Sequence, residues 1–293
     1  SAQGVIGKNE TTQPLFDLLK SDKPVQYQAS TSYSLATKGK VELAAGEVTD
    51  PNSPQNKLAW SNINIGFDVD KDLAGKYDLV SDEISFNSNF DNIEIEESKD
   101  VVMPKSVTMK MKGLKFETSF NPTKWAYIYT GKSVYSAESI EMANTNSLDD
   151  TVSIIYKGAK GTSDISLNGD FVNLKSESAV DSIVIDGKDF GKLTYNSELN
   201  HIEANAVNAL IEALFTVFKS VSDDENANQE MVSEILSSWT ENHGMAIFNN
   251  QPQIKLNPVS ISDDQGKVSL DLNVALAKDP KFDLMAGSLY KQF

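Results

Sequence analysis

Apolar residues recur at every second position over most of this 293-residue chain, and this alternation constrains the fold more than any other feature. Such a period is typical of β-strands with one buried and one wet face, as in antiparallel sheets. The alternating runs are Ile63/Ile65/Phe67/Val69, Ile93/Ile95, Val107/Met109/Met111, Ile165/Leu167, Leu193/Tyr195 and Val268/Leu270/Leu272/Val274. Turn-rich stretches separate them, and few helices stand between the runs, which excludes a doubly wound α/β fold. We expect a mainly β (α+β) protein built on a large, strongly curved antiparallel sheet.

Three segments carry helical signals instead. Residues 14–20 predict a short N-terminal helix, with Thr11 or Thr12 as N-cap and a proline in its first turn. Residues 204–220 and 226–243 each carry an apolar stripe at helical spacing. We expect these two to form a helical hairpin, at about 204–243, packed on the concave face of the sheet. Gly244 is the expected end of its second helix.

The alternation also predicts one specific strand pairing. A hairpin that turns near Val102 would place Glu94 opposite Lys110, a cross-strand pair worth roughly 0.2–1 kcal/mol. A lysine patch for anionic head groups, formed by Lys110 and Lys112, is the alternative that the nearby acids disfavour. Beyond this pair, the apolar residues change from odd-numbered to even-numbered positions at Gly113, which indicates a bulge.

A short internal repeat accompanies these elements, with units starting near residues 12 and 230. In each unit a helix is followed by a proline-started strand and a returning strand, around Pro24 and Pro252. Proline is tolerated at the first position of a strand, where its missing N–H lies outside the ladder. We expect residues 1–293 to form a single elongated β-rich domain.

Composition excludes most kinds of chemistry. The chain has 42 acidic residues against 26 basic ones, all lysine, and a net charge of −16. A nucleic-acid partner is therefore not expected, because phosphate binding needs a basic surplus and arginine usually reads base edges. The absence of cysteine removes thiol nucleophiles, disulfides and thiolate metal sites.

No catalytic, cofactor or metal-ligating residue can be assigned from the sequence. His201 and His243 stand at the expected helix ends, where a capping or surface role is favoured over catalysis. The Asp68-x-Asp70-x-Asp72 run lacks the glycine and glutamate of a calcium loop, which leaves only a weak surface calcium site as an alternative. The pairs 149–150 and 263–264 are turn aspartates rather than paired catalytic carboxylates.

Aromatic residues supply the only ligand-groove candidates. Trp125, Tyr127 and Tyr129 alternate, so they are expected on one face of a strand, either as a cross-strand ladder or as an exposed stacking platform. The helical stripe contributes Phe215, Phe218 and Trp239, which are core residues unless part of the stripe lines a cavity.

The chain starts at Ser1 without a methionine, a signal peptide or a membrane span, so we interpret it as a trimmed or mature fragment. Several of its segments resemble the YdgA-like family, a domain of unknown function in bacterial envelope proteins: residues 14–20, 190–195, 251–256, 266–272 and 278–280. The resemblance runs in order over roughly residues 9–280. It implies a Gram-negative periplasmic protein, tethered to the inner membrane in its full-length form, and it supplies no catalytic residues.

We therefore expect a non-enzymatic cell-envelope protein that acts by surface or groove binding, with a lipid or an envelope protein as its partner and no cofactor. A carrier that holds a lipid or another hydrophobic ligand in an apolar channel is the alternative. A hydrolase is a distant third.

Overall fold

The computed structural model of the chain describes residues 1–19, 21–50, 53–90, 104–146, 148–223 and 229–276. Its strands are β1 (Ala2–Val5), β2 (Val25–Thr31), β3 (Thr37–Leu43), β4 (Gly46–Asp50), β5 (Ser53–Trp60), β6 (Ile63–Val69), β7 (Gly75–Asn89), β8 (Pro104–Pro122), β9 (Tyr129–Asn146), β10 (Thr151–Asn168), β11 (Phe171–Val180), β12 (Ser182–Ile185), β13 (Lys188–Asp189), β14 (Lys192–Glu203), β15 (Gln253–Ser262) and β16 (Lys267–Ala275). Its helical elements are α1 (Gln13–Leu19), α2 (Ala204–Asp223), α3 (Gln229–Trp239), the π turn η1 (Thr240–Gly244) and α4 (Met245–Asn249).

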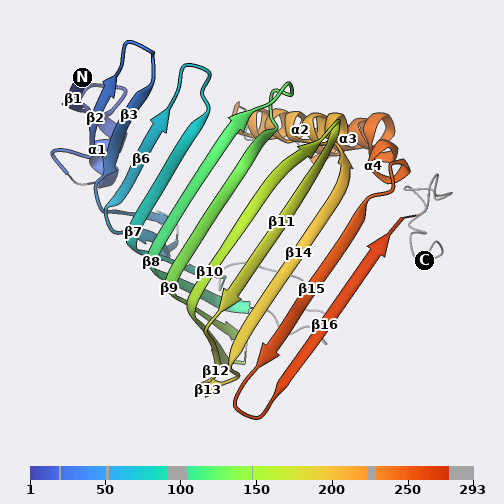
Figure 1. The fold of residues 1–293 in the computed structure, drawn as a ribbon. Helices are drawn as coiled ribbons and strands as arrows, with labels where there is room; N and C mark the ends of the chain where they lie inside the picture. The colour runs from blue at the N-terminus through green and yellow to red at the C-terminus, as the bar shows by residue number, and fades with distance from the viewer. Residues whose placement is uncertain (20, 51–52, 91–103, 147, 224–228, 277–293) are drawn as a thin grey trace.

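All strands join one antiparallel sheet, which confirms the predicted mainly β fold. The main path runs β1-β2-β3-β6-β7-β8-β9-β10-β11-β14-β15-β16, with β1 and β16 at its two ends. Figure 1 shows this path as one broad, curved layer. The described residues add almost no second layer to the sheet, so few aliphatic side chains are buried. They are Leu19, Ile128, Ala137, Ala159, Ile183, Ile202, Ala204 and Ala206, and Pro24 is fully buried as well.

The four longest strands, β7 to β10, continue past the main path and bend over at their lower ends (Figure 1). Strand β7 pairs with β6 through residues 75–81 and with β5 through residues 84–87, while β10 also pairs with the short strand β12. Gly113 and Gly158 have φ angles of 61° and 62° at this bend. The prediction of a bulge at Gly113 is wrong, because the β8–β9 register is the same on both sides of it: Lys112 pairs with Ser139 and Lys115 with Ser136. Gly113 instead supplies a left-handed backbone without an inserted residue.

The short N-terminal helix and the helical hairpin are confirmed as α1 and as α2 with α3, but the expected packing of the hairpin on the concave face of the sheet is wrong. The hairpin lies across the ends of the central strands (Figure 1) and contacts them through the β8–β9 connection and β14. Within the described part of the chain, no helix combines the length and the apolar character that crossing a bilayer requires.

The prediction that Gly244 ends the second helix is wrong. Gly244 is buried with φ of −57°, and the chain continues through η1 into α4. The Thr240 hydroxyl donates to the carbonyl of Leu236, at the point where α3 passes into the π turn. The Gly244 backbone is right-handed, so it does not form the left-handed cap that ends many helices.

The predicted partner of Lys110, Glu94, lies outside the described residues. Lys110 itself is flanked in the sheet by Ser85 on β7 and Glu141 on β9. Its ammonium group forms an ion pair at 2.9 Å with Glu83. At Lys110, strand β8 is therefore paired on both sides, with β7 and with β9.

The two repeat units occupy opposite ends of the sheet. In one, α1 and Pro24 precede the β2–β3 hairpin; in the other, α4 and Pro252 precede the β15–β16 hairpin. Each hairpin closes on its proline in the same way: the Pro24 carbonyl accepts the N–H of Ala44 at 2.9 Å, and the Pro252 carbonyl accepts the N–H of Leu276 at 3.1 Å. Both units therefore have the same helix, proline and hairpin order.

The sheet should be sensitive to a side chain at Gly131 in β9. Its φ is 146°, and an added Cβ would overlap the backbone carbonyl of Ser119 on β8, whereas Gly169 in the β10–β11 turn has φ of 63° and open space. We expect Gly169→Ala to lower the free energy of unfolding by about 1–2 kcal/mol, from the left-handed backbone alone. Gly131→Ala should lower it clearly more, as measured by urea denaturation. Equal losses would contradict the close approach of the β8 and β9 backbones at Gly131.

Candidate functional site

The strand registers bring apolar residues into line across nearly the whole sheet. A central row of directly paired residues runs from β2 to β16: Tyr27, Val41, Ile65, Leu79, Phe116, Tyr135, Gly161, Ser178, Tyr195, Val259 and Leu270. A second row on the same side contains Ile165, Leu174, Leu199, Ile254 and Val274. Between the two rows runs a row of directly paired serines, Ser133, Ser163, Ser176 and Ser197, on the same side. Because directly paired residues share a face, the three rows form one surface, which we call the apolar face.

Aromatic rings on the apolar face lie flat over glycines of neighbouring strands. The ring of Tyr135 covers Gly161, and its hydroxyl bonds to Ser178 Oγ at 2.6 Å, two strands away from β9. Tyr27 covers Gly4 and Phe67 covers Gly39 in the same way. Each glycine leaves room for a ring to lie along the sheet, which keeps the face smooth.

Four rings also form a continuous ladder on this face. Phe67 contacts Tyr77 with ring centroids 6.5 Å apart, Tyr77 stacks on Phe120 at 4.9 Å, and Phe120 meets Tyr129 edge-on at 5.9 Å. Such contacts stabilise an aromatic pair by about 0.5–1.5 kcal/mol. Even so, Tyr77 and Tyr129 remain 39% and 45% exposed. The apolar face is therefore ordered yet still open to solvent.

The opposite side of the sheet is charged. One row of directly paired residues reads Lys132, Asp164, Lys175, Glu198 and Lys255 across five strands. Glu198 bonds to Asn200 and to Lys255, and these contacts hold the pKa of its carboxyl below the usual range. Alternating charges of this kind keep a surface hydrated. The sheet thus presents one apolar and one charged face.

The prediction that Trp125, Tyr127 and Tyr129 share one strand face is wrong. Only Tyr129 lies in a strand, at the start of β9, and the other two lie in the β8–β9 connection. Pro122 ends β8, and the Thr123 hydroxyl closes the connection by donating to the carbonyl of Ile128 at 2.6 Å. Proline and a local side-chain bond override the alternating pattern here.

The connection instead meets the helical hairpin. Trp125 Nε1 donates to the Asn205 side chain at 3.3 Å, and the backbone N–H of Tyr127 donates to Asn208 at 3.0 Å. The ring of Tyr127 lies 5.5 Å from that of Phe215 on α2. A hollow of about 690 Å³ adjoins Trp125 and reaches Ile165 and Leu167. This aromatic corner therefore borders the apolar face.

The remaining groove candidates lie on the helices. Phe218 follows Phe215 by three residues on α2 and is 71% exposed. Trp239 at the end of α3 donates through Nε1 to the carbonyl of Ala206 at 3.0 Å. Trp239 thus fixes α3 against α2, whereas Phe215 and Phe218 form an exposed apolar ridge.

The histidines are held by structural contacts. His201 has φ of 66° in β14, its ring stacks on Phe171 at 3.8 Å, and its Nδ1 contacts the carbonyl of Asn250 at 2.5 Å. It thereby ties the sheet to the segment after α4. His243 lies within η1, and its carbonyl accepts the N–H of Met245. The two histidines occupy different elements.

The singled-out carboxylates serve turns and ion pairs. Asp68 forms an ion pair with Lys38 at 2.7 Å, and Asp70 accepts the backbone N–H groups of Asp72 and Ala74. Asp263 accepts the N–H groups of Gln265 and Gly266, in the turn role expected for it. Among the described residues, no group of three or more His, Asp or Glu side chains could hold a metal ion.

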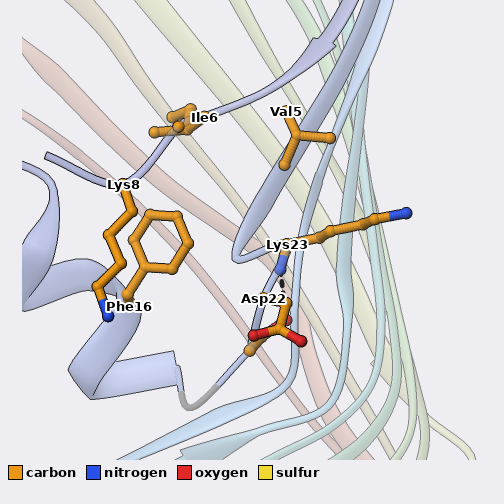
Figure 2. Close-up of a pocket in the computed structure, with 8 residues that line it drawn as sticks. Val5, Ile6, Lys8, Phe16, Asp22 and Lys23 are labelled. Carbon is orange, nitrogen blue, oxygen red and sulfur yellow. Dashed lines mark hydrogen bonds between the residues drawn. The ribbon is translucent and has the colours of Figure 1, made fainter.

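A hollow of about 520 Å³ lies between β1 and α1, at the far end of the sheet from β16 (Figures 1 and 2). Val5, Ile6 and Phe16 give it an apolar wall. Figure 2 shows the side chains of Lys8 and Lys23 directed apart, so their ammonium groups do not meet at one point. This arrangement does not form an anion site.

Most of the apolar face was not singled out from the sequence. Tyr27, Phe116 and Tyr195 each belong to an alternating segment, which predicts that they point to one side of a strand. Which strands lie side by side, and in which register, is needed before these residues can be seen to form one row. The alternation was the available signal, and the missing information was the order of the strands.

His201 should matter for stability. His201→Asn keeps a residue that tolerates a left-handed backbone but removes the ring that stacks on Phe171. We expect a loss of about 1–3 kcal/mol in the free energy of unfolding, since the Asn250 carbonyl also loses its partner. The control His243→Asn should change stability by less than about 0.5 kcal/mol. Similar losses for both variants, measured by chemical denaturation, would refute the structural role of His201.

Comparison with known proteins gives a family for the chain. A family model described as "Bacterial protein of unknown function (DUF945)" matches residues 1–290. An uncharacterized protein of Haemophilus influenzae is 31% identical over 227 residues, which cover 76% of this chain and 58% of the relative. Protein YdgA of Escherichia coli is 24% identical over 288 residues, which cover 96% of this chain and 53% of YdgA. No solved structure matches the chain.

The chain spans about half the length of the curated relatives it matches. The resemblance to YdgA-like proteins is confirmed by the match over nearly all of its residues. With its single amphipathic sheet and this match, the chain belongs to the DUF945 family of bacterial proteins.

Proposed function

We propose that this chain is a non-enzymatic binding protein of the bacterial cell envelope and that the apolar face is the surface that binds. The single observation that carries the proposal is the exposure of aligned apolar side chains across the whole sheet. Tyr27, Tyr195 and Leu270, on β2, β14 and β16, are 43%, 43% and 55% exposed. Covering apolar surface contributes about 25 cal/mol per Å², so a ligand or partner that covers several such residues would gain several kcal/mol.

The extent of the face favours a binding role over a small pocket. Large exposed apolar patches in proteins usually mark interaction sites. The face crosses the sheet from β2 to β16, and adjacent strands lie about 4.8 Å apart, so its length is on the order of 50 Å. The charged opposite side would stay in water while the apolar face is occupied.

The chemistry of the described side chains gives no support to a hydrolase. The carboxyl groups whose pKa values are lowered, such as those of Glu141 and Glu177, form ion pairs with lysines on the sheet. His201 is bonded to a backbone carbonyl rather than to a carboxylate. Binding therefore accounts for the observed groups more directly than hydrolysis does.

The family resemblance is the support for the proposed location. YdgA-like proteins are expected to be periplasmic and tethered to the inner membrane, and we propose the same location for the full-length form of this protein. A lipid or an envelope protein would then be the partner within reach. The −16 net charge suits an apolar or neutral ligand better than an anionic surface.

A lipid carrier is the second candidate, and the continuity of the central row favours it. A linear apolar ligand could follow this row across successive strands without meeting a charged side chain. The aromatic corner at Trp125, Tyr127 and Phe215 would border the ligand at one end of the strands. In this form of the proposal the ligand is an acyl chain.

The apolar face can be tested with a hydrophobic fluorescent dye, N-phenyl-1-naphthylamine. Tyr195→Lys places a charge in the central row, and the matched control Val134→Lys changes a residue of similar exposure, 42%, that pairs with Glu117 and Thr162 on the charged side. We expect Tyr195→Lys to raise the dye Kd about tenfold, from the loss of one apolar contact. Val134→Lys should leave it unchanged. Equal effects of the two variants would contradict binding at the apolar face.

The ligand class can be tested by native mass spectrometry of protein purified from a bacterial envelope. A co-purifying acyl lipid that is lost in Tyr195→Lys would support the carrier. A repeated absence of lipid, together with specific retention of an envelope protein, would favour the broader binding role. A hydrolase activity that falls sharply in His201→Ala or His243→Ala would overturn the non-enzymatic assignment.

A further inference from the structure

The two edge strands of the sheet, β1 and β16, differ in length and therefore in how readily they can pair with another strand. Strand β1 has four residues, whereas β16 has nine and pairs with β15 alone among the described strands. On β16, Val268, Leu270 and Leu272 are 72%, 55% and 43% exposed. Sheet edges are usually blunted by short strands, prolines or bulges, and a long alternating edge strand without them is prone to pair with another strand. The β15–β16 pair has a bulge between Leu256 and Val259, but its extra residue lies on β15, so β16 itself keeps a regular alternation.

The hydrogen bonds of the β15–β16 hairpin show which backbone groups face outward. The N–H of Asp263 donates to the Gly266 carbonyl at one end, and the N–H of Leu276 donates to the Pro252 carbonyl at the other. In an antiparallel pair, residues bonded to the neighbour alternate with residues whose N–H and C=O point away. The even-numbered residues of β16 therefore bond to β15. Lys267, Ser269 and Asp271 direct their N–H and C=O groups toward the open edge.

We propose that the open edge of β16 binds β16 of a second copy of this chain, in an antiparallel pair centred on Ser269. In this register, each Lys267 lies opposite Asp271 of the other copy, on the charged side of the sheet. Each Val268 lies opposite Leu270 of the other copy, on the apolar face. The pairing is isologous, so both copies contribute the same residues.

Charge complementarity selects this register. Full overlap of the two strands would place Asp271 opposite Asp271, and like charges directly opposite destabilise a strand pair. A register centred on Leu270 would place Lys267 opposite Asn273 and form no charge pair. Only the register centred on Ser269 pairs outward-facing residues with one another and forms two lysine–aspartate pairs. This self-complementarity favours a second copy over an unrelated strand.

The pairing would also join the two apolar faces. Directly opposite residues of an antiparallel pair lie on the same side, so the face would continue from one copy into the other. The charged sides would likewise form one surface. The dimer would thus double the length of the apolar face without covering it.

Cysteine substitution tests the register, because the chain contains no cysteine of its own. In the proposed pair the Cα atoms of the two Ser269 residues are about 5.5 Å apart, within disulfide range. We expect Ser269→Cys to form a disulfide-linked dimer under mild oxidation, whereas the matched controls Leu270→Cys and Asp271→Cys remain largely monomeric on a non-reducing gel. Preferential cross-linking of either control would overturn the register. A monomer at all concentrations in sedimentation velocity, without cross-linking of Ser269→Cys, would overturn the dimer.

Charge exchange tests the lysine–aspartate pairs separately. Lys267→Asp and Asp271→Lys each create two like-charge pairs, so each should raise the dimer Kd about tenfold. The double variant keeps the net charge of −16 and restores both pairs, so its Kd should return to the original value. Asp271→Lys makes the chain less acidic, and general charge repulsion would then predict tighter association. Tighter association of Asp271→Lys, or no recovery in the double variant, would overturn the proposed pairing.

Discussion

The structure depends on one constraint: the sheet has two faces, and the described residues cover little of either. One face carries charged side chains that can remain in contact with water, as in the row from Lys132 to Lys255. The other face is apolar, and the described part of the helical hairpin lies across the ends of the central strands. Packing between neighbouring rings therefore replaces packing against a second layer, as in the ladder from Phe67 to Tyr129.

Backbone features at a few positions give the sheet its shape. Gly113 and Gly158 adopt left-handed conformations where β7 to β10 bend, and Gly161 lies beneath the ring of Tyr135. These glycines have different roles. The first two allow the strands to bend, and the third leaves room for an aromatic ring of the adjacent strand to lie flat on the sheet. Together they let the strands bend and let a ring pack flat on the neighbouring strand.

The candidate site was only partly predictable. The aromatic residues at 125, 127 and 129 were grouped from the sequence, but the pattern wrongly placed all three on one strand. The Thr123 hydroxyl and Pro122 turn the chain there, and both effects are local. The contact between Tyr127 and Phe215 joins segments 88 residues apart in sequence, so no period along the chain could reveal it.

The sequence by itself determined that the chain forms amphipathic antiparallel strands, a helical hairpin and two proline-started strand hairpins. These features are set by local periodicity and by proline, glycine and turn residues, which act over a few positions. Only the tertiary structure decided the order and register of the strands, and with them the apolar face, the bend and the open edge at β16. Register depends on contacts between residues far apart in sequence, so a pattern along one strand carries no information about its neighbour.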